Sequence, residues 1–282
     1  MDFFFIQMTD PQFGMFAALS GMDETRILDL RRQLGWKIRQ TPKTTGFAYE
    51  TALYEKAIAV ANRLNPAFVV MCGDMVQDED DPSQLAELRR ITGRLDPHIP
   101  IHWAAGNRDV GNKPTQESLA RYRERFGEDQ YCFEYGGSSF IVLNNCVSFD
   151  DSLVAPEWDR QVGFLRTSLK EAQDTGSTHL VVFTHYPMYA QHRDEEDSWA
   201  VIPREKRWVL LDLFEAHGVS AVFSGHWHRN NCVAHGGIQM VTSAPVGYPL
   251  GDDPSGIRIV KVYPDRIEHQ YYGLDATPDT VG

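Results

Sequence analysis

The sequence predicts an α/β domain, because short β-rich apolar runs alternate with amphipathic helical stretches along most of the chain. Several of the apolar runs are almost unbroken by polar residues, which is typical of strands covered on both faces. The chain has 282 residues, of which 42% are hydrophobic. It is therefore long enough for one large domain or two small ones with a sizeable buried core.

The first strand is predicted at residues 3–8, where the sequence reads FFFIQM. Five later runs have the same character, and they lie at 67–72, 99–105, 139–145, 179–184 and 220–224. The pattern changes near the end, where IQMVTSAP and IRIVKVYPDRIEHQYY predict antiparallel strands. Pro264 and Asp265 mark a turn within the second of these segments.

Helices are predicted between the strands. The clearest one covers 50–64 (ETALYEKAIAVANRL) and ends at Asn65-Pro66, because a residue before proline disfavours the helical conformation. Four further helices are predicted at 83–95, 116–126, 157–173 and 204–217. Residues 13–49 are less regular and long for a connection inside a compact domain, so we expect either a functional lid or extra helices there.

Composition and charge exclude some function classes. The formal net charge is −12, which argues against a nucleic-acid-binding protein with a basic face. Anionic substrates remain possible, because a bound cation can reverse the local field. The four cysteines form no CxxC pair, so we expect mostly buried free thiols. The opening MDFFFIQMTD resembles neither a signal peptide nor a membrane span, and we expect a cytoplasmic protein.

Polar side chains follow five of the apolar strands at the point where each strand ends. In open α/β sheets, ligands gather at the carboxyl ends of the strands. The residues that we expect at this edge are Asp10, Asp74, Asn107, Asp109, His185, His226 and His228.

These residue types together indicate a metal site. Carboxylate, amide and imidazole ligands suit Mn²⁺, Fe and Zn²⁺, and Asp74 offers two oxygens that can bridge two ions. Two ions ~3.5–4 Å apart can clamp a phosphoryl group and supply a hydroxide nucleophile. Each motif alone is ambiguous, since a single strand-end aspartate is more often a turn residue and a single histidine more often structural. The ordered set is the specific signal.

The order of the motifs resembles the calcineurin-like metallophosphoesterase superfamily. The motifs are an aspartate at position 10, then Gly-Asp, Gly-Asn-x-Asp, His and Gly-His-x-His, ending at position 228. The sequence is most similar to the calcineurin-like phosphoesterase domain-containing serine/threonine phosphatases. This similarity is carried by DPQFG, by FSGHWHRN and by the tail LGDDPSGIRIVKVYPDRIEHQYYGLD.

The resemblance implies a four-layer sandwich of two mixed sheets flanked by helices. We therefore expect one calcineurin-like phosphoesterase domain over 1–282, and the length of the segment 13–49 indicates a lid or cap insertion there. Asp10 and His228 would hold the first metal ion, and Asp74 would bridge. The second ion would be held by Asn107, His185 and His226.

Two positions depart from the superfamily pattern. Gln12 stands where most members have a histidine ligand, and its neutral amide oxygen is a poorer partner for a transition metal. Arg108 stands where a histidine is thought to protonate the leaving group. Arginine keeps its proton but can bind phosphate bidentately and offset developing negative charge. Asp109 would then pair with Arg108 and fix the guanidinium.

The implied function is hydrolysis of a phosphoester or phosphoanhydride by a dinuclear centre and a metal-bound hydroxide. Asp74, Asn107, Arg108 and Asp109 would be the catalytic residues. The ions would be Mn, Fe or Zn, with Mg possible, and the substrate a phosphorylated small molecule, a nucleotide or a phosphoprotein. The GNRD motif is locally similar to UDP-diacylglucosamine pyrophosphohydrolases, which cleave an anhydride. A non-catalytic or weakly active scaffold on the same fold is the alternative that Gln12 and Arg108 leave open.

Features outside the motifs are less specific. The loop 189–205 follows His185 and either selects the substrate or is a solvated charged loop. Residues 111–127 predict an amphipathic helix with three arginines. Among the tryptophans, only Trp227 is linked to the site by sequence, since it lies between two of the predicted ligands.

Overall fold

The apolar runs form the centres of two β-sheets in the computed structural model, which describes residues 2–282. The first sheet has the order β11-β10-β1-β2-β3, in which β1, β2 and β3 are parallel and β10 and β11 are antiparallel to their neighbours. Its strands are β1 (Phe3–Met8), β2 (Val69–Cys72), β3 (Ile101–Ala104), β10 (Gly256–Val262) and β11 (Ile267–Gly273).

The second sheet has the order β4-β5-β6-β7-β9-β8. Strands β5, β6, β7 and β9 are parallel, whereas β4 and β8 are antiparallel edge strands. Its strands are β4 (Tyr131–Tyr135), β5 (Ser138–Val142), β6 (Leu180–Phe183), β7 (Ala221–Ser224), β8 (Asn231–His235) and β9 (Ile238–Thr242).

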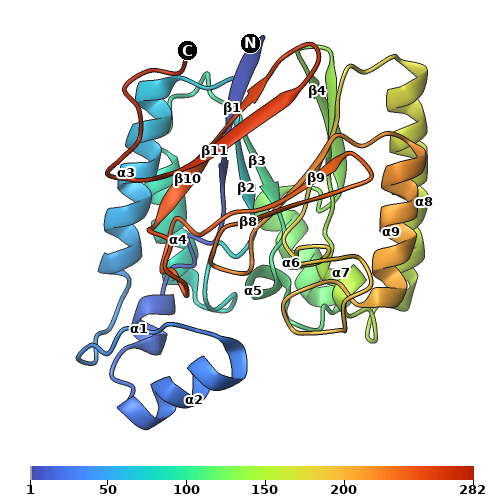
Figure 1. Cartoon of the computed structure of the whole chain (residues 1–282). Coiled ribbons are helices and arrows are strands. Elements are labelled where there is room, and N and C mark those ends of the chain that lie inside the picture. Colours follow the sequence, from blue (N-terminus) through green and yellow to red (C-terminus); the bar gives the residue numbers. More distant parts are fainter. Residues whose placement is uncertain (1) are drawn as a thin grey trace.

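Helices cover the outer faces of both sheets and complete the four layers (Figure 1). Helices α3 and α4 lie outside the first sheet, and α8 and α9 lie outside the second. The helices are α1 (Met15–Leu19), α2 (Glu24–Leu34), α3 (Ala48–Leu64), α4 (Pro82–Thr92), α5 (Asn107–Val110), α6 (Gln116–Phe126), α7 (Cys146–Phe149), α8 (Ala155–Asp174) and α9 (Arg204–Ala216). This arrangement confirms the predicted α/β sandwich of two mixed sheets.

The predicted strands and long helices are all present, with ends that shift by a few residues. Strands β4 and β8 were not predicted from the sequence. Both lie at sheet edges and keep exposed residues along their length, so they lack the unbroken apolar run that marks a central strand.

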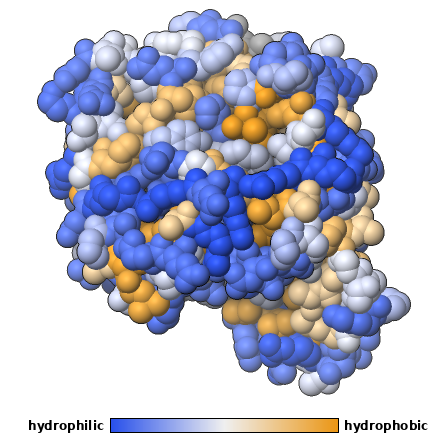
Figure 2. All heavy atoms as spheres, turned by 180° about the vertical axis from the view of Figure 1, so that it is seen from behind, coloured by the Kyte–Doolittle hydropathy of each residue, from blue (hydrophilic) through white to orange (hydrophobic). Residues whose placement is uncertain are grey.

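Residues 13–49 contain the two helices α1 and α2, which form a lobe that protrudes from the body (Figures 1 and 2). Helix α2 begins after Asp23, whose side chain accepts a hydrogen bond from the Arg26 amide, and it ends at Gly35 in the left-handed conformation. Leu30 and Ile38 of this lobe belong to a separate apolar cluster that also includes Tyr248. The lobe is therefore held against the loop after β9.

Two of the four cysteines are buried. The four thiols are free as predicted, but only Cys72 and Cys146 are buried, whereas Cys132 and Cys232 are exposed on strands at or near sheet edges. In the part of the chain that the structure describes, every helix is too short or too polar to cross a bilayer.

Phe5 fixes the packing between the two sheets. Its side chain is fully buried, stacks on Phe68 at 4.8 Å and meets Phe140, Phe183 and Phe223 edge-on at 5.6–5.8 Å. All three edge-to-face contacts join β1 of the first sheet to strands of the second, since Phe140 lies in β5, Phe183 in β6 and Phe223 in β7. The relative position of the sheets, and so of the strand ends, depends on this aromatic layer.

We expect Phe5→Ala to lower the free energy of unfolding by about 3–5 kcal/mol, because it removes a fully buried ring and leaves a cavity. Urea denaturation followed by circular dichroism measures the change. Leu153→Ala is the matched control, since Leu153 is 61% exposed. An equal change in both variants would contradict the assigned role of Phe5.

Candidate metal centre

The carboxyl ends of the central strands of both sheets meet at one edge of the sandwich. Asp10 follows β1, Asp74 follows β2, His185 follows β6 and His226 follows β7. Within each sheet these strands run parallel, so their ends point the same way. Asn107 joins them as the first residue of α5, directly after β3.

The turns after these strands hold an unusual backbone conformation. Among residues 2–282, six non-glycine residues have a positive φ angle, and they are Asp10 (49°), Gln12 (39°), Asn65 (55°), Asp74 (52°), His226 (68°) and His228 (51°). Five of the six belong to the predicted metal ligands. Left-handed backbone costs of order 1 kcal/mol or more for such residues and is concentrated at functional sites. The fold therefore maintains these turns for the orientation of the side chains.

Two glycines of the motifs are required by close packing. A Cβ atom on Gly225 would lie 1.8 Å from the Thr9 hydroxyl, and one on Gly106 would lie 2.1 Å from the Asp74 amide nitrogen. Neither site has room for a side chain. Gly225 thus allows the turn after β7 of the second sheet to approach the turn after β1 of the first, and Gly106 allows the turns after β2 and β3 of the first sheet to approach each other.

One group of ligands surrounds His185. Its Nε2 lies 3.0 Å from Asn107 Oδ1, 3.3 Å from Asp74 Oδ1 and 3.2 Å from His226 Nδ1. Ligand atoms of Asp74, His185 and His226 all lie within 4.8 Å of one another. A carboxylate, an amide oxygen and two imidazoles thus converge on one point, which is a donor set that fits a transition-metal ion.

A second group lies around Asp10. His228 Nε2 is 3.2 Å from Asp10 Oδ1, and both side chains are buried. Gln12 donates a hydrogen bond from Nε2 to Gln77 Oε1 at 2.9 Å. Its Oε1 is buried and has no hydrogen-bond partner among the described residues. An orphaned amide oxygen beside a carboxylate and an imidazole fits a ligand to a second cation.

Each of the three histidines uses its second ring nitrogen to bind a backbone carbonyl. His185 Nδ1 lies 2.8 Å from Cys72 O, His226 Nε2 lies 3.0 Å from Trp199 O, and His228 Nδ1 lies 2.7 Å from Tyr248 O. A carbonyl oxygen accepts only from an N–H, so these contacts set the ring orientation and assign a proton to that nitrogen. The remaining nitrogen of each neutral ring is free to coordinate a metal, as is usual for histidine ligands.

The site balances buried carboxylates with positive charge. Burial opposes ionisation of Asp74, but His185 and His226 outweigh it and lower the pKa of Asp74 to about 2. Burial also opposes protonation of His185, yet the Asp74 carboxylate raises its pKa to about 9. Burial and then the charge of His185 lower the pKa of His226 to about 3. A proton on His185 therefore neutralises the negative charge of the Asp74 carboxylate, which a bound metal ion would otherwise neutralise.

The predicted pairing of Asp109 with Arg108 is wrong. The Asp109 carboxylate accepts hydrogen bonds from the backbone amides of Asp74 (2.8 Å), Met75 (2.9 Å) and Gly106 (2.8 Å). These amides are closer and fixed, so Asp109 braces the turns after β2 and β3 instead of the guanidinium. Arg108 donates its own backbone N–H to Asp74 Oδ1 at 2.7 Å.

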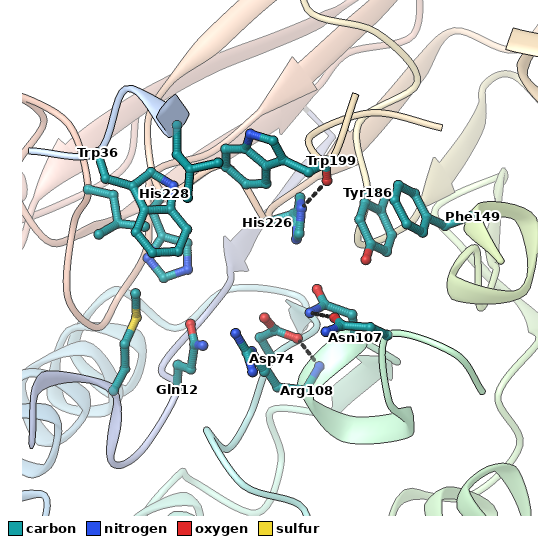
Figure 3. A pocket seen from close by; sticks show the side chains of 14 residues that line it. Gln12, Trp36, Asp74, Asn107, Arg108, Phe149, Tyr186, Trp199, His226 and His228 are labelled. Carbon is teal, nitrogen blue, oxygen red and sulfur yellow. Dashed lines mark hydrogen bonds between the residues drawn. The ribbon is translucent and has the colours of Figure 1, made fainter. Parts of the chain in front are cut away.

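The ligands open into a cavity of about 390 Å³. Figure 3 shows polar side chains on one side of it and aromatic rings on the other. The polar side carries Gln12, Asp74, Asn107 and Arg108, and the aromatic side carries Trp36, Phe149, Tyr186 and Trp199.

Sequence reasoning missed most of the aromatic side. Trp36 belongs to the 13–49 lobe and Trp199 to the 189–205 loop, and the two rings meet edge-on at 5.8 Å. Trp227, which the sequence linked to the site, does not line the cavity and instead lies under the Arg229 guanidinium, 5.4 Å away. Alternation along the loop turns its ring away while both neighbouring histidines face inward.

The loop 189–205 is anchored from below by Arg207. This side chain is fully buried and donates to the carbonyl oxygens of Ile202 (2.9 Å), Arg193 (2.8 Å) and Glu195 (3.0 Å). The loop in turn supplies the Trp199 carbonyl to His226. The predicted helix within 111–127 is α6, and its arginines bind acidic residues or backbone outside the cavity.

Comparison with known proteins agrees with this geometry. The family model of the calcineurin-like phosphoesterases matches residues 43–230. The chain belongs to the calcineurin-like phosphoesterase family. It is therefore a phosphoric ester hydrolase by family, and the predicted resemblance is confirmed.

Relatives within this family cover almost the whole chain. The serine/threonine-protein phosphatase CPPED1 of Danio rerio is 35% identical over 280 residues, covering 97% of this chain and 85% of that protein. The human CPPED1 is 34% identical with 97% and 84% coverage. Among solved structures, a dimetal phosphatase from Danio rerio has a TM-score of 0.66 at 16% identity, covering 96% of both chains. A purple acid phosphatase from yellow lupin has a TM-score of 0.63 at 12% identity, covering 96% of this chain and 51% of that one.

We expect Asp74→Asn to abolish tight Mn²⁺ binding in this phosphoesterase, because the Asp74 carboxylate lies within 4.8 Å of the ligand atoms of His185 and His226. Metal content after dialysis and calorimetric titration measure the loss. Asp159→Asn is the matched control, since Asp159 is exposed on α8. Unchanged metal content in Asp74→Asn would exclude the assigned site.

We expect Gln77→Leu to weaken the binding of one ion about 10- to 100-fold, because Gln77 orients the Gln12 amide. Gln12→His should bind Zn²⁺ more tightly than the wild type, since imidazole is the better ligand for this ion. Calorimetric titration with Zn²⁺ resolves both effects. Gln173→Leu, at an exposed position of α8, serves as the control, and equal affinity in all four proteins would refute the role of Gln12.

Proposed function

We propose that the chain hydrolyses phosphate esters at a centre of two metal ions. Asp10, Gln12 and His228 would hold one ion, and Asn107, His185 and His226 would hold the other, with Asp74 between them. The single observation that carries the proposal is the convergence of these side chains from five strand ends, with a free ligand atom on each imidazole.

The bound ions supply positive charge at the phosphoryl oxygens and activate a water molecule for attack. Metal content after dialysis, the measurement described for Asp74→Asn, also identifies which of Mn, Fe, Zn and Mg the wild-type protein binds. Neutral imidazoles, carboxylates and the amide oxygens of Gln12 and Asn107 keep the donor set compatible with Mn, Fe and Zn.

Arg108 distinguishes this chain from the usual pattern of the superfamily. Its side chain lines the cavity beside Asp74 and Asn107 (Figure 3). A guanidinium binds two phosphoryl oxygens in parallel and stabilises the charge that develops on them. It does not release a proton to the leaving group. The site therefore favours phosphate esters whose leaving oxygen is stable without protonation.

The alternative of a non-catalytic scaffold has less support. It rests on Gln12 and Arg108, but the Gln12 oxygen is directed away from its only amide partner and remains available. The other six ligands match the family motifs. A phosphoserine or phosphothreonine substrate, as the name of the CPPED1 relatives suggests for those proteins, is also a phosphate ester, but its aliphatic leaving oxygen makes it a less favoured substrate in this proposal.

We expect hydrolysis of 4-nitrophenyl phosphate with Mn²⁺, and a loss of about 10²- to 10³-fold in kcat for Arg108→Ala, the size of a lost charge-stabilising donor. Arg108→His should restore a proton donor and narrow the ratio of kcat between 4-nitrophenyl phosphate and phosphoserine. Steady-state kinetics with both substrates measure these values. Asp159→Asn controls for general effects, and a wild-type rate no greater than that of Asp74→Asn would rule out the proposed function.

A further inference from the structure

The aromatic side of the cavity is built by two segments that are distant in sequence. Trp36 and Leu34 come from the end of α2 and the residues after it, and Trp199 comes from the 189–205 loop. The two indole rings are nearly perpendicular, at 83°. Both tryptophans are half-buried, so they form a corner whose inner faces remain open to the cavity.

This corner is fixed by contacts on both sides. The Lys37 amide donates to Leu250 O at 2.9 Å, and the Arg39 amide donates to the Tyr248 hydroxyl at 2.8 Å. The Trp199 carbonyl contacts His226. The rings are thus held in place relative to the proposed metal ligands before any substrate enters.

Phe149 and Tyr186 extend the aromatic side toward the ligand group around His185, to which His226 belongs. Their rings stack at 4.4 Å and 5°, and the Tyr186 ring lies 4.1 Å from that of His226. Flat aromatic surface therefore begins beside the proposed metal ligands and continues outward. A substrate that places a ring close to its phosphorus would contact this surface.

The charges of the lining point to the same kind of substrate. Among the residues that line the cavity, Arg108 is the one arginine or lysine, and it lies at the polar side with Asp74. The lining also contains the apolar side chains of Met15, Leu34 and Leu250 beside Trp36. Such a surface offers no ion pair to a charged or strongly polar leaving group, and it gains free energy by burying an apolar one.

We propose that the preferred substrates are aryl phosphates, in which the phosphate is attached directly to an aromatic ring. This inference rests on the proposed function and names its substrate class. The phenolic oxygen leaves without protonation far more easily than an aliphatic one, because a phenol ionises near pH ~10. The aromatic corner binds the ring, and Arg108 binds the phosphoryl oxygens.

The reaction is a hydrolysis with a simple balance. The oxygen of water forms a bond to phosphorus, and the bond between phosphorus and the phenolic oxygen breaks. The electron pair of that bond leaves on the phenolic oxygen. The products are inorganic phosphate and a phenol, and the protons of the water are shared between them and the solvent.

Three substrates separate ring binding from leaving-group chemistry. Phenyl phosphate has both the ring and the phenolic oxygen, benzyl phosphate has the ring but an aliphatic oxygen, and ethyl phosphate has neither. We expect the highest kcat/KM for phenyl phosphate, a similar KM but lower kcat for benzyl phosphate, and a higher KM for ethyl phosphate. A phosphotyrosine peptide and a phosphoserine peptide of otherwise identical sequence then show whether the ring is accepted on a polypeptide.

Trp36→Ala tests the aromatic corner. We expect KM for phenyl and benzyl phosphate to rise roughly 3- to 10-fold, the size of one lost aromatic contact, while KM for ethyl phosphate stays constant. Trp36→Phe should retain most of the affinity. Melting temperatures of both variants close to that of the wild type would show that they are folded. Trp208→Ala is the matched control, since Trp208 lies on α9, is 42% exposed and does not line the cavity.

The outcomes distinguish this inference from the proposed function. If the wild type hydrolyses all esters at similar kcat/KM, or if Trp36→Ala changes all three equally, the phosphoesterase assignment stands and the aryl preference is wrong. A kcat/KM that is higher for adenosine monophosphate than for phenyl phosphate, with this difference absent in Trp36→Ala, would show that the corner binds a nucleobase. This result would also overturn the proposed preference for aryl phosphates. Absence of hydrolysis of every ester would instead remove the proposed function.

Discussion

The burial of carboxylates at the meeting point of two sheets is the constraint on which the rest of the structure depends. Asp10, Asp74 and Asp109 are at most 4% exposed. An ionised carboxylate in such a place is costly unless it is paired and hydrogen-bonded. Asp109 is satisfied by three backbone amides, whereas Asp10 and Asp74 face imidazoles. The site is therefore complete only with cations, either protons on histidine or metal ions.

This constraint explains why the ligands were readable from the sequence. A strand covered on both faces must be apolar, so a charged residue that directly follows it marks the point where the chain leaves the sheet. Asp10, Asp74, His185 and His226 all have this position. The family resemblance then assigned the ligands to the two ions. The central strands were predicted from their apolar runs, and the long helices from their amphipathic patterns. The edge strands β4 and β8 did not, because exposed residues interrupt their pattern.

The supporting contacts could not be predicted, because most are made by the backbone. Each histidine is oriented by a carbonyl oxygen, and a carbonyl leaves no mark on the residue type that carries it. The same holds for Asp109, whose expected arginine partner was replaced by amides. Arg207 falls within the predicted helix 204–217, and nothing in its sequence context indicates that it is fully buried under the loop that reaches His226. These hydrogen bonds to backbone atoms become visible only in the folded structure.

The molecule separates the groups that would activate phosphate from the surface that would select its ester. The proposed metal ligands lie on turns after buried strands, where a substitution disturbs both sheets. Trp36 sits on a lobe with its own small apolar cluster, formed by Met15, Leu30, Ile38, Tyr248 and Leu250. Such a lobe can change its cavity-facing residues without altering the strands that position Asp74 and His185, in the way that loops on a rigid scaffold carry specificity. Arg108, at the position where the superfamily usually has histidine, is related to this separation. As proposed above, a site with arginine in place of the histidine would select its substrate by the stability of the leaving oxygen. The segment best placed to make that selection is the lobe, because it is the part least constrained by the core.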